Sequence, residues 1–257
     1  MKTFGSFFGG LKHDGGGLEG PPLLIIHIAK TAGTSLRRML QAELGMPAIY
    51  PSERDLAKLP HGWYRTGRDI LENHHTLPPH RVLIGHFAAE LADRLPIPYS
   101  TAAFVRDPLQ RSLSCLAHFE RHYGRPPTEL LRDTDFIGTQ ILDYQTKVLG
   151  GRGITDLHEH CEIDDATLSR AIARIGRLDF VGITERSPES FELFDRRFGT
   201  HIAQHQVREN VLRPEGRELS ELLPRIEEHV RRDRVLYEAA VARLEIDLAA
   251  APARGHT

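Results

Sequence analysis

A loop of small and polar residues near the start of the chain carries the first side chains that could do chemistry. It has the sequence Ala29-Lys30-Thr31-Ala32-Gly33-Thr34-Ser35 and joins an apolar run to a helical pattern. Small residues let backbone N–H groups converge, a helix N-terminus favours negative charge, and a lysine and hydroxyls add donors. The loop therefore predicts an oxyanion cradle. It is not a Walker A loop, which needs glycine directly before the lysine. Taken alone, it is equally compatible with an ordinary strand-to-helix turn capped by Thr34 or Ser35.

A second group of such side chains lies in Arg106-Asp107-Pro108-Leu109-Gln110-Arg111-Ser112-Leu113-Ser114. Arg106 ends an expected strand, and Ser114 lies two turns into the helix that follows. Ligands of open parallel sheets bind at the carboxyl ends of the strands, so this group and the loop should face one crevice. An arginine fork and a hydroxyl suit a second phosphate there. The alternative is that Arg106 caps the helix or pairs with Asp107.

Short apolar runs that alternate with helical patterns must position these residues. Runs at 23–28, 82–84, 101–105 and 178–183 are typical of strands buried on both faces. Apolar residues spaced by three and four predict helices after the first, third and fourth runs, with Asp107-Pro108 and Ser187-Pro188 as cap and first turn of two of them. Further helices are expected over 129–149, 164–176 and 218–246. The alternation predicts an α/β fold with a central parallel sheet flanked by helices.

Glycine content sets the expected domain boundaries. Residues 1–20 hold seven of the 22 glycines and are followed by Pro21-Pro22. A segment this rich in glycine has too few side chains to bury for packing to offset the loss of backbone entropy. We therefore predict a flexible leader over 1–20. A single domain over 21–250 and a disordered tail over 251–257 complete the expected organisation.

Charge and cysteine content disfavour several classes of protein. The 257 residues include 33 Lys+Arg and 35 Asp+Glu, so 33 − 35 gives a net charge of −2 and no general reason to expect nucleic-acid binding. The apolar run at 23–28 falls far short of the ~20 residues that span a bilayer, so no membrane span is predicted. Cys115 and Cys161 form no C-x-x-C pair, which favours reduced thiols and a cytoplasmic location. His158-Glu159-His160-Cys161 lacks the paired spacing of a zinc site, so no metal is expected.

Both motifs together resemble the PAPS-dependent sulfotransferases, most closely the family-2 carbohydrate group that includes heparan sulfate 2-O-sulfotransferases. The stretch from His27 to Ser35 is similar to that family's H-I-P-K-T-[AG]-G-T-[ST] loop for the 5′-phosphosulfate. The stretch from Arg106 to Ser114 is similar to its R-[DN]-P-x-x-R-x-x-S segment for the 3′-phosphate. One departure is Ala29, where the family usually has proline. The resemblance implies a P-loop-type sulfotransferase fold and PAPS as the co-substrate.

Residue roles follow from this resemblance. Lys30 would neutralise the bridging oxygen of the departing nucleotide, while Arg106 and Ser114 would hold the 3′-phosphate. The remaining loop residues would hold the 5′-phosphate through backbone and hydroxyl donors: Thr31, Ala32, Gly33, Thr34 and Ser35. His86 follows a short strand and is the expected base for the acceptor hydroxyl, with Glu90 as the second choice. A carbohydrate is the favoured acceptor, and no metal is needed.

Some assignments stay open. Arg37 and Arg38 either help to hold an anion or are solvated, and His27 is expected to pack inside the first strand. A nucleotide-dependent phosphoryl transferase would bind ATP and magnesium instead of PAPS. A non-catalytic module that binds PAP, another nucleotide or a glycan would not depend on His86. The sequence does not identify the acceptor or the oligomeric state.

Overall fold

A five-stranded parallel sheet forms the centre of the computed structural model, which describes residues 18, 20–56, 66–152, 161–205 and 217–251. Across the sheet the strands follow the order β2-β3-β1-β4-β5. Their bounds are β1 Leu23–Ile26, β2 Ile49–Tyr50, β3 Val82–Gly85, β4 Ser100–Val105 and β5 Phe180–Ile183. The predicted α/β class with a central parallel sheet is confirmed, and each of the four predicted strands is present. The two-residue edge strand β2 was not predicted, because it is too short to give a periodic pattern.

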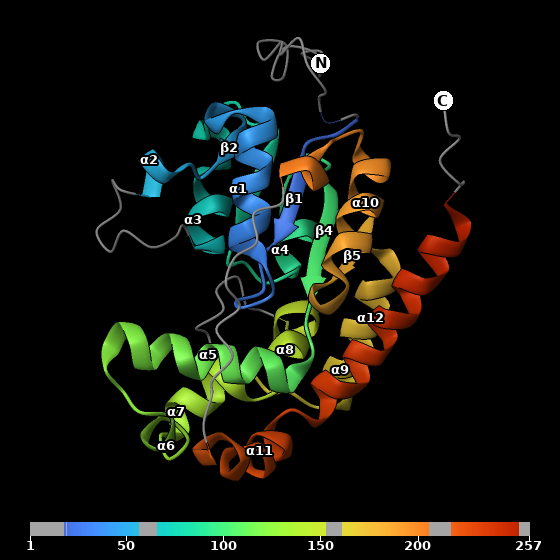
Figure 1. Cartoon of the computed structure of the whole chain (residues 1–257). Helices are drawn as coiled ribbons and strands as arrows, with labels where there is room; N and C mark the ends of the chain where they lie inside the picture. Colours follow the sequence, from blue (N-terminus) through green and yellow to red (C-terminus); the bar gives the residue numbers. More distant parts are fainter. Residues whose placement is uncertain (1–17, 19, 57–65, 153–160, 206–216, 252–257) are drawn as a thin grey trace.

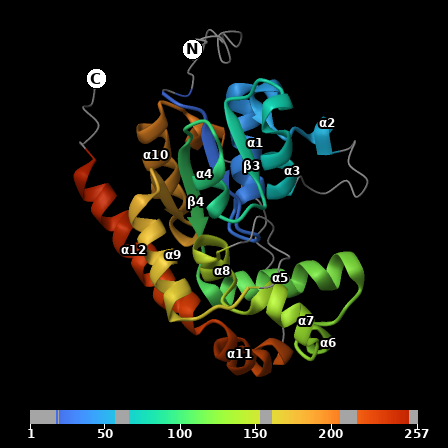
Figure 2. The same cartoon turned by 180° about the vertical axis from the view of Figure 1, so that it is seen from behind.

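The described part of the chain contains twelve α-helices. They are α1 Gly33–Leu44, α2 Glu53–Leu56, α3 Gly67–Asn73, α4 Glu90–Arg94, α5 Pro108–Tyr123, α6 Pro127–Leu130, α7 Thr134–Phe136, α8 Tyr144–Gly150, α9 Asp165–Arg177, α10 Ser187–Phe198, α11 Arg217–His229 and α12 Arg231–Ala250. Helices α1 and α10 lie on one side of the sheet and α4 and α9 on the other (Figures 1 and 2). Asp107 caps α5 as predicted, whereas α10 begins at Ser187 itself, after Arg186.

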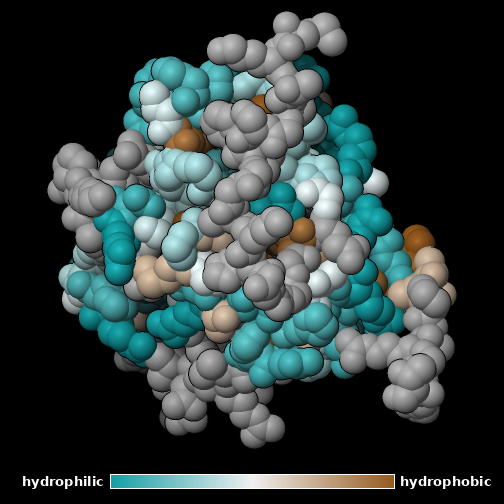
Figure 3. Space-filling model, turned by 90° about the horizontal axis from the view of Figure 1, so that it is seen from above, coloured by the Kyte–Doolittle hydropathy of each residue, from teal (hydrophilic) through white to brown (hydrophobic). Residues whose placement is uncertain are grey.

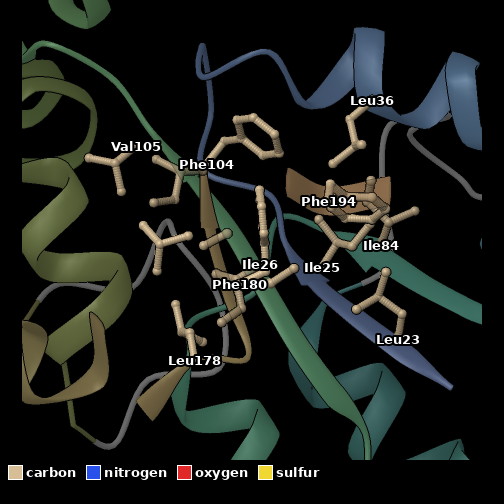
Figure 4. Close-up of a cluster of buried hydrophobic side chains, with 14 of the residues drawn as sticks. Leu23, Ile25, Ile26, Leu36, Ile84, Phe104, Val105, Leu178, Phe180 and Phe194 are labelled. Carbon is tan, nitrogen blue, oxygen red and sulfur yellow. The ribbon is translucent and has the colours of Figure 1, made fainter. Parts of the chain in front are cut away.

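The core lies between the sheet and these helices. Strand side chains such as Ile25, Ile84 and Phe104 pack with Leu36 of α1 and Phe194 of α10 (Figure 4). On the opposite side, Leu24 and Leu83 pack with residues of α3 and α4. Neighbouring strand residues thus point to opposite faces, and both faces are covered. This burial explains why the strands appear in the sequence as continuous apolar runs.

Two of the predicted helices are wrong in extent. The segment predicted as one helix over 129–149 contains α6, α7, a π-helical turn at Ile137–Ile141 and α8, with Asp143 in a left-handed conformation (φ 38°) before α8. The segment predicted over 218–246 contains α11 and α12, which are separated at Val230. Asp143 Oδ1 accepts hydrogen bonds from the backbone N–H groups of Arg232 and Asp233 at the start of α12. This long-range capping favours the breaks over continuous helices.

The predicted leader is described only at its end. Leu18 is buried in the core, and Arg81 Nη2 donates to the carbonyls of Leu18 (2.7 Å) and Gly20 (3.0 Å). Residues 1–17 and 19, and 252–257 of the predicted tail, lie outside the described residues.

Seen from above, the surface is mainly hydrophilic, and its hydrophobic residues are scattered in small groups (Figure 3). None of the described helices has the length and apolar composition that crossing a membrane requires.

Candidate functional site

The carboxyl ends of β1 and β4 form the topological switch point of the sheet. From β1 the chain continues through α1 to β2 on one side, and after β4 it reaches β5 on the other. Connections that diverge in this way leave a crevice at the carboxyl ends of the two strands, where open α/β sheets bind ligands. The loop at 29–35 and Arg106 both lie there. Helix α5 crosses this end of the sheet (Figures 1 and 2).

The loop after β1 has an unusual backbone. Lys30 and Ala32 have φ values of 70° and 68°, in the left-handed region that residues with a side chain seldom adopt. Left-handed residues that alternate with right-handed ones turn successive N–H groups toward one concave side, a nest for anions. Ala32 is the N-cap of the twelve-residue α1 and makes no side-chain cap bond, so Thr34 or Ser35 is not the cap. The first N–H groups of α1 add further donors.

The hydroxyl groups of the loop differ in position. Thr31 is 1% exposed, and its Oγ1 donates to the carbonyl of Ile28 at 2.8 Å. One hydroxyl has one hydrogen, so in this conformation the Thr31 side chain stabilises the loop and cannot also donate to a phosphate. Thr34 is exposed and Ser35 is half-buried. Donation from the hydroxyl of Thr31, expected from the sequence, therefore does not fit, whereas its backbone N–H stays a candidate donor.

Lys30 lies in a positive environment. Burial lowers the pKa of its ammonium group, and the charges of Arg106, Arg111 and Arg121 lower it further, against an opposing effect of the Cys115 thiol. Several cations held near each other in a partly buried place repel one another, and an anion between them relieves this repulsion. The site is thus arranged for a ligand with negative charge.

The side chain of Arg106 binds the backbone of the loop. Its Nη1 donates to the carbonyl of Lys30 at 3.0 Å, and its Nε lies 3.7 Å from Glu185 Oε1. The Nε atom is buried and has no hydrogen-bond partner within the described structure. Asp107 pairs with Arg234 Nη1 at 3.0 Å, so the Arg106–Asp107 ion pair that the sequence left open is replaced by these two pairs.

A chain of buried hydrogen bonds connects Arg106 to the last helix. The Gln145 amide accepts from the Arg106 backbone N–H (3.0 Å) and donates to the Arg106 carbonyl (2.8 Å). Asp233 of α12 accepts from the N–H groups of Gln145 (3.1 Å) and Thr146 (2.7 Å), which start α8. Burial raises the pKa of Asp233 to about 6. These contacts fix the carboxyl end of β4, and they join residues too far apart in the chain for a local pattern to predict them.

His86 follows β3 and stacks on His27. The two ring centroids are 4.2 Å apart, and His86 Nδ1 lies 2.9 Å from the His27 carbonyl. A carbonyl only accepts hydrogen bonds, so Nδ1 carries the hydrogen and Nε2 of the neutral ring has the lone pair that a base needs. His27 follows β1 and does not lie within it, which corrects the sequence expectation. Burial, followed by the charges of His86, Arg37 and Lys30, lowers the pKa of His27.

Gly33 makes this arrangement possible. A Cβ atom on Gly33 would lie closer to the His27 ring than the 3.0 Å below which real Cβ atoms are essentially never found. The first turn of α1 therefore packs directly on the His27 ring, which also stacks on His86. The loop and the candidate base share this half-buried support.

His118 is a further candidate that the sequence analysis missed. It lies on α5 four residues after Ser114 and seven after Arg111, so all three share one side of the helix. Burial and the charges of Lys30, His122 and Arg121 lower the pKa of His118 to about 4. The spacing of these polar residues along α5 was the available signal. Ser114 itself is half-buried on this side.

The remaining candidates lie around this centre. Arg37 is half-buried, and its guanidinium donates to the carbonyls of Pro51 and Ile84 (2.5 and 2.8 Å). Glu90, the second choice of base, is half-buried and begins α4. Of the stretch 158–161, only Cys161 lies within the described residues. Within those residues, no three His, Cys, Asp or Glu side chains gather as a metal site would require.

Comparison with known proteins leaves the family unassigned. The sequence matches no protein-family model, and no curated protein is similar to it. Function must therefore be argued from the site itself.

Proposed function

We propose that this protein is a sulfotransferase that moves a sulfuryl group from PAPS to a hydroxyl group, with a carbohydrate as the acceptor class. The observation that carries the proposal is the gathering of partly or wholly buried cations, Lys30, Arg106 and Arg111, around a left-handed backbone loop at the switch point of the sheet. Arg106 lies near Glu185, but no salt bridge to Lys30 or Arg111 is present within the described residues, and this excess of partly buried positive charge favours an anionic ligand. We further propose that the fold is of the P-loop-like sulfotransferase type.

PAPS fits this charge distribution because it has two anionic ends. Its 5′-phosphosulfate would bind the backbone N–H groups of the loop and the start of α1, next to Lys30. Its 3′-phosphate would lie at Ser114 on α5 and at Arg106, whose buried Nε has no hydrogen-bond partner among the described residues. A nucleotide without the 3′-phosphate would leave a buried guanidinium unsatisfied, which is costly. This difference gives the expected preference for PAP over other nucleotides.

The reaction is an in-line displacement at sulfur. The acceptor oxygen forms a bond to sulfur while the bond between sulfur and the bridging oxygen breaks, and PAP leaves with that electron pair. Lys30 neutralises the charge that develops on the bridging oxygen. The acceptor's proton passes to Nε2 of His86, whose Nδ1–H donates to the His27 carbonyl. The low pKa of the desolvated His27 keeps that ring neutral, so it does not oppose the charge that His86 gains.

The experiment is a comparison of binding and turnover in purified protein. Calorimetry should show PAP binding that is tighter than that of ADP and independent of magnesium. Labelled PAPS with a panel of glycans should show transfer. Lys30→Ala and Arg106→Ala should each reduce transfer by at least about 100-fold, the usual loss of one oxyanion-stabilising group.

The outcomes separate the proposal from its alternatives. His86→Gln should retain PAP affinity and lose transfer, whereas a binding module would be indifferent to this change. A requirement for ATP and magnesium would point to phosphoryl transfer. Absence of PAP binding by the wild-type protein would refute the proposed function.

A further inference from the structure

Arg111 is a buried cation whose charge no carboxylate of the described residues neutralises. Its side chain lies near the start of α5 and has 0% exposure. Its Nε donates to the Ala29 carbonyl (3.2 Å), its Nη1 donates to the Gln140 carbonyl, and its guanidinium carbon lies 3.8 Å from the centroid of the Tyr144 ring. Nη2 is buried with no hydrogen-bond partner, and no carboxylate of the described residues pairs with this guanidinium.

Such an arrangement is costly for folding alone. An ionised group loses hydration free energy when it is buried, and neutral carbonyls and an aromatic ring return only part of it. A hydrophobic side chain of similar size would fill the same space without that cost. The retained charge therefore indicates a role outside the stability of the core, and its position under the loop at 29–35 suggests which one.

Arg111 and Arg106 hold two consecutive peptide groups of that loop. Arg111 binds the carbonyl of Ala29, and Arg106 binds the carbonyl of Lys30. In a trans peptide the C=O and the following N–H point in opposite directions, and the one cis bond among the described residues is Tyr50-Pro51. The N–H groups of Lys30 and Thr31 therefore point away from the two guanidinium groups.

We propose that Arg111 is a positioning residue for anion binding. It fixes the Ala29–Lys30 peptide so that the Lys30 N–H faces the anion, and its unneutralised charge lies beneath the loop. The proposal deepens the proposed function, on which it rests for the identity of the donor. Arg111 acts on the phosphosulfate end of the donor through the loop and not on the proton transfer at His86.

Variants at two positions of α5 test this role. Arg111→Met removes the charge and the clamp, and Arg111→Lys keeps the charge but lacks the planar fork that reaches two carbonyls. Arg121→Met is the matched control, because Arg121 is exposed on the same helix and its charge also acts on Lys30. Binding of PAP and of pyrophosphate is measured by calorimetry, and thermal unfolding identifies variants that fold.

Loss of charge-assisted hydrogen bonds predicts about 10- to 100-fold weaker binding of both anions by Arg111→Met. Arg111→Lys should lie between this variant and the wild type, and Arg121→Met should change binding by less than about threefold. The KM for PAPS should rise in the Arg111 variants, while the KM for the acceptor stays unchanged. Should Arg111→Met fail to fold, Arg111→Lys decides, because a purely structural arginine would leave anion affinity unaltered in a folded lysine variant.

Each outcome bears on one proposal or both. Anion affinities of the folded Arg111 variants within twofold of the wild type overturn the role of Arg111 and leave the sulfotransferase proposal intact. Wild-type binding of pyrophosphate without binding of PAP refutes the donor, and the pyrophosphate series still decides the role of Arg111. Failure of the wild type to bind either anion overturns both.

Discussion

Gly33→Ala is the most direct test of the shared support beneath the loop and the candidate base. The new methyl group would occupy space that the His27 ring fills, so the ring or the first turn of α1 must shift. Overpacking of this kind costs about 1–3 kcal/mol of unfolding free energy. For a chain of this size, each kcal/mol lowers the unfolding midpoint by about 2–4 °C, which gives a decrease between about 2 and 12 °C. A shifted His27 also displaces His86, so transfer should fall more than PAP affinity.

Gly176→Ala is the matched control for this change. Gly176 lies near the end of α9, and a Cβ atom there would meet nothing within 4 Å. Alanine is the better helix former by up to about 1 kcal/mol, so the midpoint should stay level or rise. In a His27→Ala background, Gly33→Ala should cost less than about 0.5 kcal/mol, because the ring it meets is gone. A Gly33→Ala midpoint that matches or exceeds that of Gly176→Ala would refute the packing argument.

Three further changes test other parts of the structure. Gln145→Leu leaves the N–H and carbonyl of Arg106 without hydrogen bonds, so the free energy of unfolding in denaturant should fall by about 2–4 kcal/mol. PAP affinity should fall as well. Unchanged PAP affinity in the folded variant would contradict the link between Gln145 and the loop. The pKa of Asp233 is about 6 in the folded protein and 3.8 for the unperturbed group, so the folded protein binds this proton more tightly than the unfolded chain does. The contribution of Asp233 to stability therefore falls as pH rises from about 4 to 6. The stability difference between wild type and Asp233→Asn, from urea unfolding at each pH, should therefore decrease over that range, and a constant difference would exclude this titration. Asp93→Asn removes an exposed partner of Arg174 and should change stability by less than about 1 kcal/mol, whereas a larger loss would mark that pair as structural.

Features of the fold that depend on residues close together in the chain were predicted from the sequence, and features that depend on distant residues were not. Apolar runs revealed four strands, because burial on both faces leaves a local signature. The cap of α5 by Asp107 was predicted for the same reason, since it depends on residues three positions apart. The breaks before α8 and α12 depend on Asp143 and Asp233, which lie 90 residues apart in the chain. No local pattern carries such a contact.

In the candidate site, too, local motifs were predicted and long-range contacts were not. The motif residues Lys30 and Arg106 were predicted to lie near one crevice, and Arg106 does contact the loop. The place of His27 between Gly33 and His86 was not foreseen, because a histidine next to an apolar run looks like part of the strand. The clamp formed by Arg111 needs the three-dimensional path of the loop. Only His118 could have been found from helical spacing alone.

The hydrogen-bonded chain from Asp233 through Gln145 to Arg106 has a consequence for synthesis of the protein. During translation the loop after β1 emerges early, and Arg106 follows well before α12. Domains generally fold as units. The loop therefore lacks this support until the last helix has been made. A nascent chain that stalls before Asp233 would expose the loop at 29–35 without its final support.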